Sequence, residues 1–505
     1  MSQKKLGVIL AYMSEAVRII TALLYTPIML RILGKTEYGL YQLVASTVSY
    51  LSLLNLGFTG TYTRFYIKAK KESKNAANIV NGMFMKLFLL MSIICIICGG
   101  ILIFNVEAFF GYKLSQNNFQ EAKILIGILI ISMALSFPTS VFTCNIDANE
   151  RFIFEKGITL LQNFFNPFLC LPLLLLGYGN VGIVSASLVL TAAKLFVCAW
   201  YAIKKLNMQF NMKEFNSSLF KEMGGFTFFI FLNQIIDQVN WNLDKYLLGR
   251  LASLSAVAIY GVGSQLNSLY ISCSNAISSV FAPQINNIVI NENDDGKLTN
   301  IFIKVGRIQY IVVYLILLGF LLLGKPFIML WAGTEYINAY YVAIALMIPM
   351  LIPLIQNIGI EIQRAKNKHQ VRSIVYLIMA VLNAGVSIPL IMKFGEIGAA
   401  LGTTISLFLG NILFMNIYYH IKLNINIISF WKSILNMIPA SLICLGIGIC
   451  ISKISLNVNA WIELLIKIIM LIVVYFVTFW FCGFNSEEKR MFVEIKLKTI
   501  NKMRR

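Results

Sequence analysis

Apolar runs of 18 or more residues recur from one end of this chain to the other. A helix of that length can cross the hydrocarbon core of a bilayer, which is about 30 Å thick. Only 13% of the 505 residues are charged, whereas roughly 25% is usual in a soluble domain. The sequence therefore predicts an all-α polytopic membrane protein. Its connections are short, and none is large enough to form an extramembrane enzyme domain.

Polar breaks between the apolar windows predict about fourteen membrane-spanning helices. Their ranges are 7–30, 40–62, 81–104, 122–144, 157–177, 182–203, 223–247, 255–282, 301–323, 338–360, 371–392, 397–419, 431–452 and 461–483. An even number of spans places both termini on the same side of the membrane.

Basic residues are concentrated in alternate connections of this arrangement. The termini and every second connection hold 30 of the 42 Lys and Arg residues, and the opposite connections hold 9. Cytoplasmic connections of membrane proteins are enriched in Lys and Arg, so both termini are predicted to be cytoplasmic. The net charge of +20 is explained in the same way. Nucleic-acid binding is not expected, because the basic residues do not gather on one soluble face.

The predicted halves share a pattern of polar residues. On one face of the first span, and again in the seventh, polar residues follow the spacing 4, 3, 4, which keeps side chains on one side of a helix. The two sets are Ser14, Arg18, Thr21 and Tyr25, and Asn233, Asp237, Asn240 and Asp244. Glu15 borders the first set and Trp241 the second. The following spans carry similar sets, namely Asn55, Thr59, Tyr62 and Tyr66, and Ser268, Ser272, Asn275 and Ser279.

Two interpretations of these polar faces are open. Polar side chains can simply hold membrane helices together. Ionisable groups at membrane depth, however, cost several kcal/mol unless they face water or a partner, which favours a polar cavity between two halves. We therefore predict two pseudo-symmetric six-helix lobes around a cavity, followed by two apolar C-terminal helices. The predicted parts are an N-lobe (1–203), an amphipathic cytoplasmic linker (204–222), a C-lobe (223–419), helices 13 and 14 (420–484) and a basic tail (485–505).

Several short motifs, in order along nearly the whole chain, resemble those of polysaccharide flippases. The polysaccharide flippases meant here form the Wzx-like O-antigen and capsule branch of the multidrug/oligosaccharidyl-lipid/polysaccharide (MOP) exporter superfamily. The motifs are Leu33-Gly34-Lys-Thr-Glu37-Tyr38-Gly39-Leu40-Tyr41, Phe327-Ile-Met-Leu-Trp331-Ala-Gly333, Arg364-Ala365-Lys-Asn367-Lys-His369 and Gly398-Ala-Ala400-Leu-Gly402-Thr403. Each motif alone is weak, and together they indicate the superfamily better than the substrate.

The resemblance implies a non-enzymatic flippase in a bacterial plasma membrane. It would move an undecaprenyl-pyrophosphate-linked oligosaccharide from the cytoplasmic to the outer leaflet by alternating access. Its expected partners are this lipid-linked substrate, membrane lipids and possible polysaccharide polymerase and glycosyltransferase enzymes. A flippase for the peptidoglycan precursor and a cation-coupled multidrug exporter of the same superfamily are the alternatives.

A pyrophosphate-linked sugar needs cations, hydroxyls and amides along its route, and Arg binds phosphate in a bidentate manner. The candidate substrate-binding residues are Arg18, Tyr25, Asn55, Arg64, Asn233, Asn240, Trp241, Arg307 and Arg364. Two simpler interpretations remain open. Arg18 could form a local salt bridge with Glu15, and the other three arginines could only anchor the topology as cytoplasmic charges.

Three carboxylates are candidates for coupling transport to H⁺ or Na⁺, namely Glu15, Asp237 and Asp244. A carboxylate in a dry cavity can take up and release a proton. Lys245 could instead neutralise a neighbouring carboxylate. Neither the coupling ion nor the sugar follows from the sequence, and no metal site, catalytic residue or organic cofactor is predicted.

Overall fold

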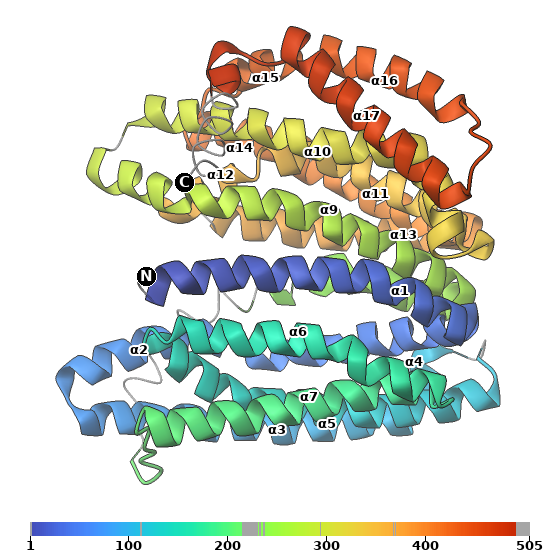
Figure 1. Ribbon diagram of the computed structural model, residues 1–505. Coiled ribbons are helices and arrows are strands. Elements are labelled where there is room, and N and C mark those ends of the chain that lie inside the picture. Colours follow the sequence, from blue (N-terminus) through green and yellow to red (C-terminus); the bar gives the residue numbers. More distant parts are fainter. Residues whose placement is uncertain are drawn as a thin grey trace, which may run out of the picture. The chain divides into compact units, whose positions relative to one another are not determined.

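The computed structural model describes residues 3–111, 114–214, 231, 234–235, 238–292, 294–366, 368 and 370–490. Every regular element among these residues is helical, which confirms the predicted all-α class. Long helices run back and forth between short connections (Figure 1). This is the arrangement that a bilayer requires, because a helix satisfies its own backbone hydrogen bonds where water is absent.

Short 3-10 and π segments, labelled η, interrupt or extend the helices. The elements before residue 206 are α1 (Gln3–Ser49), η1 (Tyr50–Asn55), α2 (Phe58–Glu72), α3 (Lys74–Phe104), α4 (Val106–Phe110), α5 (Gln116–Ala148), α6 (Phe152–Leu175), α7 (Gly179–Trp200) and η2 (Tyr201–Lys205). Residues 238–251 are also helical. The later elements are α9 (Leu254–Asn287), η3 (Ile288–Glu292), α10 (Asp295–Trp331), η4 (Thr334–Tyr336), α11 (Asn338–Ile355), α12 (Ile358–Ala365), α13 (Gln370–Leu407), η5 (Phe408–Phe414), α14 (Met415–Lys422), α15 (Ile427–Leu435), α16 (Ile438–Lys453) and α17 (Ala460–Cys482).

Ten helical runs among the described residues are long and apolar enough to cross a membrane. Two of them, Ile9–Glu72 and Gln370–Lys422, are long enough to contain two predicted spans each. α9 covers the predicted span 255–282, and the span 223–247 lies partly outside the described residues. The structure thus agrees with a multi-pass bundle, while the count of fourteen and the side of the termini stay predictions.

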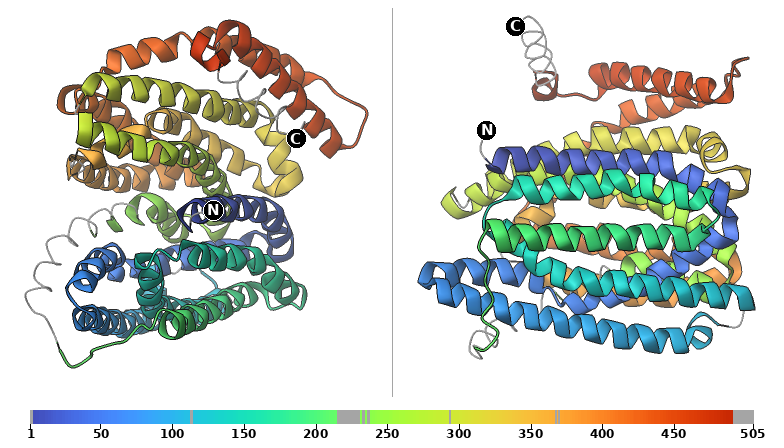
Figure 2. Two further views of the ribbon diagram at one scale, coloured as in Figure 1. Left: turned by 60° about the vertical axis from the view of Figure 1, so that its left-hand side comes forward. Right: turned by 60° about the horizontal axis from the view of Figure 1, so that its bottom comes forward.

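Two compact units make up the chain, and each combines separate stretches of sequence. Unit 1 consists of Met1–Val262 and Ser373–Thr403, and unit 2 of Gly263–Arg372 and Thr404–Arg505. In unit 1, α5 lies between α3 and α7 and packs on both of them (Figure 2). The lobe boundaries predicted from the sequence stay a prediction.

In unit 2, the last two predicted spans are attached to α10 by polar contacts. The predicted span 431–452 is divided into α15 and α16, and α17 packs beside α16 and on α10 (Figure 1). The hydroxyl of Tyr310 is 2.8 Å from that of Ser441, and Tyr475 donates to the carbonyl of Ile311 at 2.8 Å. These helices were predicted as an apolar appendage, and the structure shows polar bonds that hold them in place.

The predicted amphipathic linker at 204–222 is not a helix over its described residues 206–214. This part lies against the start of α3. The backbone nitrogen of Asn211 donates to the carbonyl of Asn78 at 2.9 Å, and the amide of Asn81 donates to the carbonyl of Gln209 at 2.9 Å. A Cβ on Gly82 would lie 2.1 Å from the carbonyl oxygen of Asn211, so only glycine permits this approach. Hydrogen bonds to α3 therefore hold this segment in a non-helical conformation.

Candidate functional site

The site is built on a reversal of the chain within α13. Gly395, at φ 58° and ψ −131°, breaks the helical conformation there, and its positive φ is readily adopted by glycine. The two halves of α13 then pack closely. A Cβ on Gly398 would lie 2.0 Å from the carbonyl oxygen of Leu390, and one on Gly402 would lie 2.0 Å from Oγ of Ser387. The two glycines of this motif thus allow the helix halves to touch.

The close packing brings Asn383 on the first half of α13 to Thr403 on the second. The amide nitrogen of Asn383 lies 3.4 Å from Oγ1 of Thr403, and Ser387 donates to Oδ1 of Asn383 at 2.8 Å. Thr403 in turn donates to Oδ2 of Asp244 at 2.7 Å, and the hydroxyl of Tyr260, near the start of α9, donates to the same oxygen at 2.5 Å. All these residues belong to unit 1.

Asp244 is the buried acid of this cluster, with only 1% of its surface exposed. Its Oδ1 is buried and accepts no hydrogen bond from the described residues. No ion pair to Asp244 is formed among those residues either. Burying a lone carboxylate is costly, and such a group takes up a proton or a cation instead. The arrangement can therefore hold one positive charge, as a proton on the carboxylate or as a small cation among oxygen atoms.

Lys245, the neighbour of this acid, points to a different partner. Its ammonium donates to Oε1 of Gln42 at 3.0 Å, and the amide nitrogen of Gln42 lies 2.6 Å from the hydroxyl of Tyr38. The side chain of Gln42 also lies beside Gly261, where a Cβ would be 3.1 Å away. The segments that follow the first and seventh predicted spans thus pack on each other inside unit 1. Among the described residues, Lys245 forms no ion pair with Asp244.

Arg18 and Glu15 form the local salt bridge that was one of the two interpretations. The guanidinium reaches both carboxylate oxygens, at 2.5 and 2.9 Å. The two side chains remain 44% and 38% exposed, so the pair keeps room for a further contact. Ser14, on the same face, accepts a 3.0 Å hydrogen bond from Asn163 of α6. The hydroxyl of Tyr25 is buried beside Cys170 of the same helix α6.

The remaining candidates on the polar faces lie as follows. Asn55 ends η1, and its buried Oδ1 has no hydrogen-bond donor among the described residues. Asn240 is partly buried and Trp241 is 41% exposed, both on the helix that carries Asp244. Asn233 and Asp237 lie outside the described residues. The predicted cavity between the two lobes stays a prediction.

The three arginines at predicted cytoplasmic helix ends differ in environment. Arg64 on α2 is exposed, and Arg364 on α12 pairs with Glu361 at 2.9 Å while remaining 66% exposed. Arg307 on α10 is buried, with 4% of its surface exposed. Its three nitrogens donate to both carboxylate oxygens of Glu488 and to backbone carbonyls at Ser433 and Gly483. The structure gives Arg307 a role in holding α10 to the C-terminal segment.

The polar face of the second predicted span holds helices together. Tyr62 donates to Oδ1 of Asn81 on α3 at 2.6 Å and accepts from Asn145 on α5 at 2.8 Å. All three side chains are buried. For these residues the structural interpretation of the polar pattern is correct.

Three residues of the cluster around Asp244 were not predicted as site residues. Thr403 ends the motif that begins at Gly398, whereas Tyr260 and Asn383 lie outside the four motifs named above. Asn383 and Ser387 are polar residues four positions apart in an otherwise apolar span, which places them on one helix face. This spacing was the available signal.

The fold resembles several solved transporters over most of their length. A structure described as the lipid II flippase MurJ in an inward closed conformation superposes with a TM-score of 0.75, 17% identity, and coverage of 93% of this chain and 98% of that one. An inward-facing multidrug resistance MATE family transporter of the MOP superfamily superposes with a TM-score of 0.66 and 13% identity. The match covers 84% of this chain and 99% of that one. A MOP superfamily transporter from Pyrococcus furiosus superposes with a TM-score of 0.56 and 14% identity, and the match covers 82% of this chain and 94% of that one. At these identities the likeness establishes the fold.

Fold and composition together define a multi-pass membrane protein with the architecture of MOP superfamily transporters. The sequence model of the family described as "Polysaccharide biosynthesis protein" matches residues 6–289, which is more than half of the chain. The chain belongs to that family. A search of curated proteins found no match.

Proposed function

We propose that this protein is a flippase for an undecaprenyl-pyrophosphate-linked oligosaccharide, which it moves from the cytoplasmic to the outer leaflet by alternating access. The match to a polysaccharide biosynthesis family carries this proposal. The MOP fold supports it, since a bundle of two units offers the moving parts that alternating access needs. Arg18, half exposed beside Glu15, is the residue of α1 suited to the pyrophosphate.

The buried cluster around Asp244 is the proposed coupling site. Its carboxylate has two hydroxyl donors on Oδ2, and its Oδ1 accepts no hydrogen bond from the part of the chain that the structure describes. It can therefore accept H⁺ or Na⁺ from one side of the membrane. Asn383 and Thr403 sit on opposite halves of α13. Loading or release of a positive charge at Asp244 changes the contacts between these halves and the helix 238–251. Differential binding of the ion in two conformations is what allows a gradient to drive transport.

The substrate is tested with purified protein in liposomes that contain a labelled lipid-linked oligosaccharide in the inner leaflet. Appearance of the sugar outside is followed by its accessibility to a membrane-impermeant sugar-modifying enzyme. Two parallel samples test the alternative substrates. One contains a lipid-linked peptidoglycan precursor and the other a cationic dye. Transport of the oligosaccharide alone supports the proposal, whereas movement of the dye or of the precursor in preference to it refutes the proposal.

The coupling ion is tested in the same liposomes by imposing a pH gradient or a Na⁺ gradient separately. Asp244→Asn serves as the matched variant, because it keeps the shape of the side chain and removes its charge. One of the two gradients is expected to accelerate wild-type transport and to have no effect on the variant. An equal response of wild type and variant would show that the coupling site lies elsewhere.

A further inference from the structure

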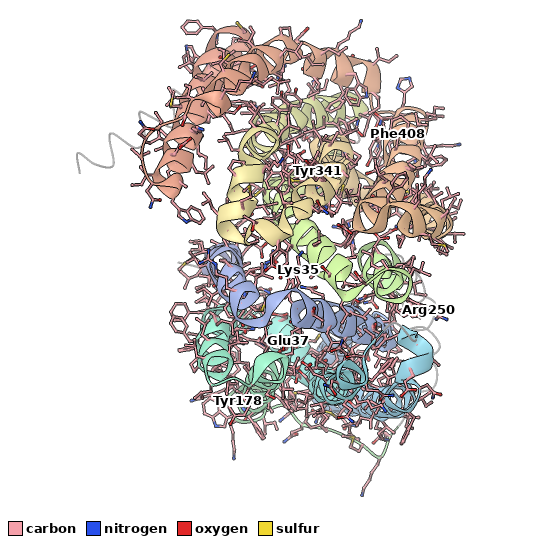
Figure 3. All side chains as sticks on the ribbon, turned by 90° about the vertical axis from the view of Figure 1, so that its right-hand side faces the viewer. Lys35, Glu37, Tyr178, Arg250, Tyr341 and Phe408 are labelled. Atoms are coloured by element: carbon pink, nitrogen blue, oxygen red, sulfur yellow. The ribbon has the colours of Figure 1, made fainter. Side chains whose placement is uncertain are left out.

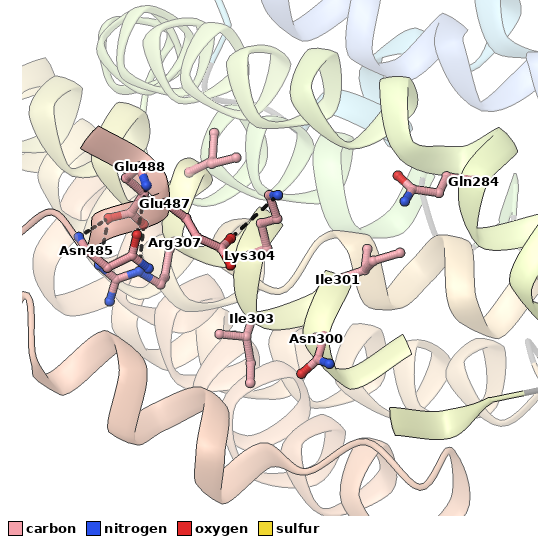
Figure 4. Close-up of a pocket in the computed structure, with 10 residues that line it drawn as sticks. Gln284, Asn300, Ile301, Ile303, Lys304, Arg307, Asn485, Glu487 and Glu488 are labelled. Atoms are coloured by element: carbon pink, nitrogen blue, oxygen red, sulfur yellow. Dashed lines mark hydrogen bonds and ion pairs between the residues drawn. The ribbon is translucent and has the colours of Figure 1, made fainter. Parts of the chain in front are cut away.

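A cavity of about 490 Å³ lies in unit 2, between the end of α9, the start of α10 and the segment that follows α17 (Figure 4). Its volume is within the usual range for small-molecule sites, about 300–1,000 Å³. Its lining mixes amides and charges with isoleucines. The polar members are Gln284, Asn300, Lys304, Arg307, Asn485, Glu487 and Glu488, and the apolar ones are Ile301, Ile303 and Ile308.

The back of this cavity is formed by the buried pair Arg307 and Glu488. Because every nitrogen of that guanidinium donates to a protein oxygen, Arg307 is committed to the fold. Asn485 closes the turn, since its backbone nitrogen donates to Oε2 of Glu488 and its Oδ1 accepts from the nitrogen of Glu488, both at 2.8 Å. The wall is therefore rigid, and the charges that can meet a ligand lie nearer the opening.

Lys304 and Glu487 are those charges. Their nearest nitrogen and oxygen atoms are 3.7 Å apart, and the side chains are 49% and 71% exposed. Figure 4 shows the two side chains reaching toward each other across the cavity. Such a loose, exposed pair contributes little to stability. It can open without loss of structure and offer one ammonium and one carboxylate to a bound molecule.

The charges of the lining residues indicate which net charge a ligand of this cavity should have. Two cations, Lys304 and Arg307, face two carboxylates, Glu487 and Glu488, so the cavity has no net charge. A pyrophosphate dianion would find no excess positive charge here. A zwitterion, with one anionic and one cationic group, would find a partner for each.

The predicted spans place the cavity at the level of the membrane interface. It lies where the apolar part of α10 begins and that of α17 ends, at the predicted cytoplasmic side. Trp480 near the end of α17 is 37% exposed, and the ammonium of Lys489 lies 6.0 Å from its ring centre. Trp and basic residues gather at the level of lipid headgroups. The isoleucines of the lining can contact the glycerol region of a lipid whose headgroup enters the cavity.

We propose that this cavity binds the headgroup of a zwitterionic membrane phospholipid of the ethanolamine type. Lys304 would bind the phosphate and Glu487 the ammonium group. The bound lipid would thereby fill the space between α10 and the C-terminal segment. This inference does not depend on which substrate the protein transports.

The test uses the delipidated full-length protein in detergent, titrated with short-chain phosphatidylethanolamine and followed by native mass spectrometry. Phosphatidylglycerol, which lacks the ammonium group, and soluble phosphoethanolamine, which lacks the acyl chains, are titrated in parallel. We expect one phosphatidylethanolamine to bind with an affinity at least several-fold above those of both comparison ligands. Equal or tighter binding of phosphatidylglycerol, or equal binding of phosphoethanolamine, would overturn the proposal.

Variants locate the site. Lys304→Gln and Glu487→Gln should each weaken phosphatidylethanolamine binding several-fold, and neither residue is needed for folding, because both are exposed. Lys297→Gln and Glu292→Gln are the matched controls. They belong to another exposed Lys–Glu pair near the start of α10, with its atoms 2.5 Å apart, that lies outside the lining. If the controls weaken binding as much as the cavity variants do, the lipid binds elsewhere and the assignment is wrong.

Discussion

The hydroxyl of Thr403 donates a 2.7 Å hydrogen bond to Oδ2 of Asp244, and so joins two residues that are 159 positions apart in the chain. With Tyr260 on the same oxygen, this bond fixes one side of a buried carboxylate and leaves Oδ1 for an ion. The pair therefore offers a way to distinguish the two candidate coupling ions.

Thr403→Ala is predicted to show whether Na⁺ or H⁺ is the coupling ion. Removing the hydroxyl deletes one oxygen that a cation beside Asp244 could use, but leaves the carboxylate able to bind a proton. If Na⁺ is the coupling ion, the Na⁺ concentration for half-maximal transport should rise by about tenfold, which corresponds to about 1.4 kcal/mol. Thr403→Ser keeps the hydroxyl and should behave like the wild type.

Arg18→Ala is predicted to stop flipping while leaving the amount of membrane-inserted protein unchanged. The Arg18–Glu15 pair is half exposed, and exposed pairs contribute only about 0–1 kcal/mol to stability. Glu15→Gln breaks the same pair but keeps the cation, so it separates a role in binding from a role in pairing. We expect the Glu15 variant to retain transport in the liposome assay. Full polysaccharide export by the Arg18 variant at normal protein level would remove Arg18 from the substrate site.

Arg307→Ala is predicted to lower stability, with little change in the transport rate per folded molecule. Breaking a buried ion pair by removing one partner costs about 3–5 kcal/mol, because the other charge stays buried. Thermal unfolding in detergent should therefore occur at a clearly lower temperature. Arg307→Met combined with Glu488→Leu removes both charges and should recover much of the loss. A stable Arg307 variant with a raised half-saturation concentration for substrate would instead support the substrate-binding prediction.

Gly39→Ala is predicted to destabilise unit 1. A Cβ at this position would lie 2.0 Å from the carbonyl oxygen of Leu254, and overpacking of this kind costs about 1–3 kcal/mol. The added atom meets backbone, which cannot rotate away as a side chain can. Gly100→Ala is the control, since a Cβ there meets no atom within 4 Å. The prediction fails if the two variants unfold at the same temperature.

The sequence predicts the helices of this protein well, because span length and hydropathy depend only on neighbouring residues. It also singles out Asp244, since a carboxylate within an apolar run needs an explanation. The partners of Asp244 could not be predicted in the same way. Asn383 and Thr403 come together only through the reversal at Gly395 and the close packing at Gly402, which are tertiary features.

Two contacts in the structure lie beyond what the local sequence pattern can predict. The segment 206–214 has an amphipathic composition, but hydrogen bonds to Asn78 and Asn81 on α3 hold it in an irregular conformation. Arg307 was a candidate either for substrate binding or for anchoring the topology, and the structure pairs it with a carboxylate 181 residues later. Both contacts join segments that are far apart in the sequence, where helical periodicity carries no information.

Glu37, in the motif between the first two predicted spans, is expected to make stability depend on pH. It lies with Lys35 and Tyr178 at the end of unit 1 seen in Figure 3. Burial, and then the nearby charge of Glu121, raise the pKa of Glu37. Since the folded carboxyl then binds its proton more tightly than the unfolded one, stability should fall as pH rises through the folded pKa. Glu37→Gln should therefore raise the unfolding temperature at pH 8 and reduce the difference between pH 5 and pH 8. Glu107→Gln, which removes a carboxylate from α4, is the control, and an equal effect in that variant would contradict the role of Glu37.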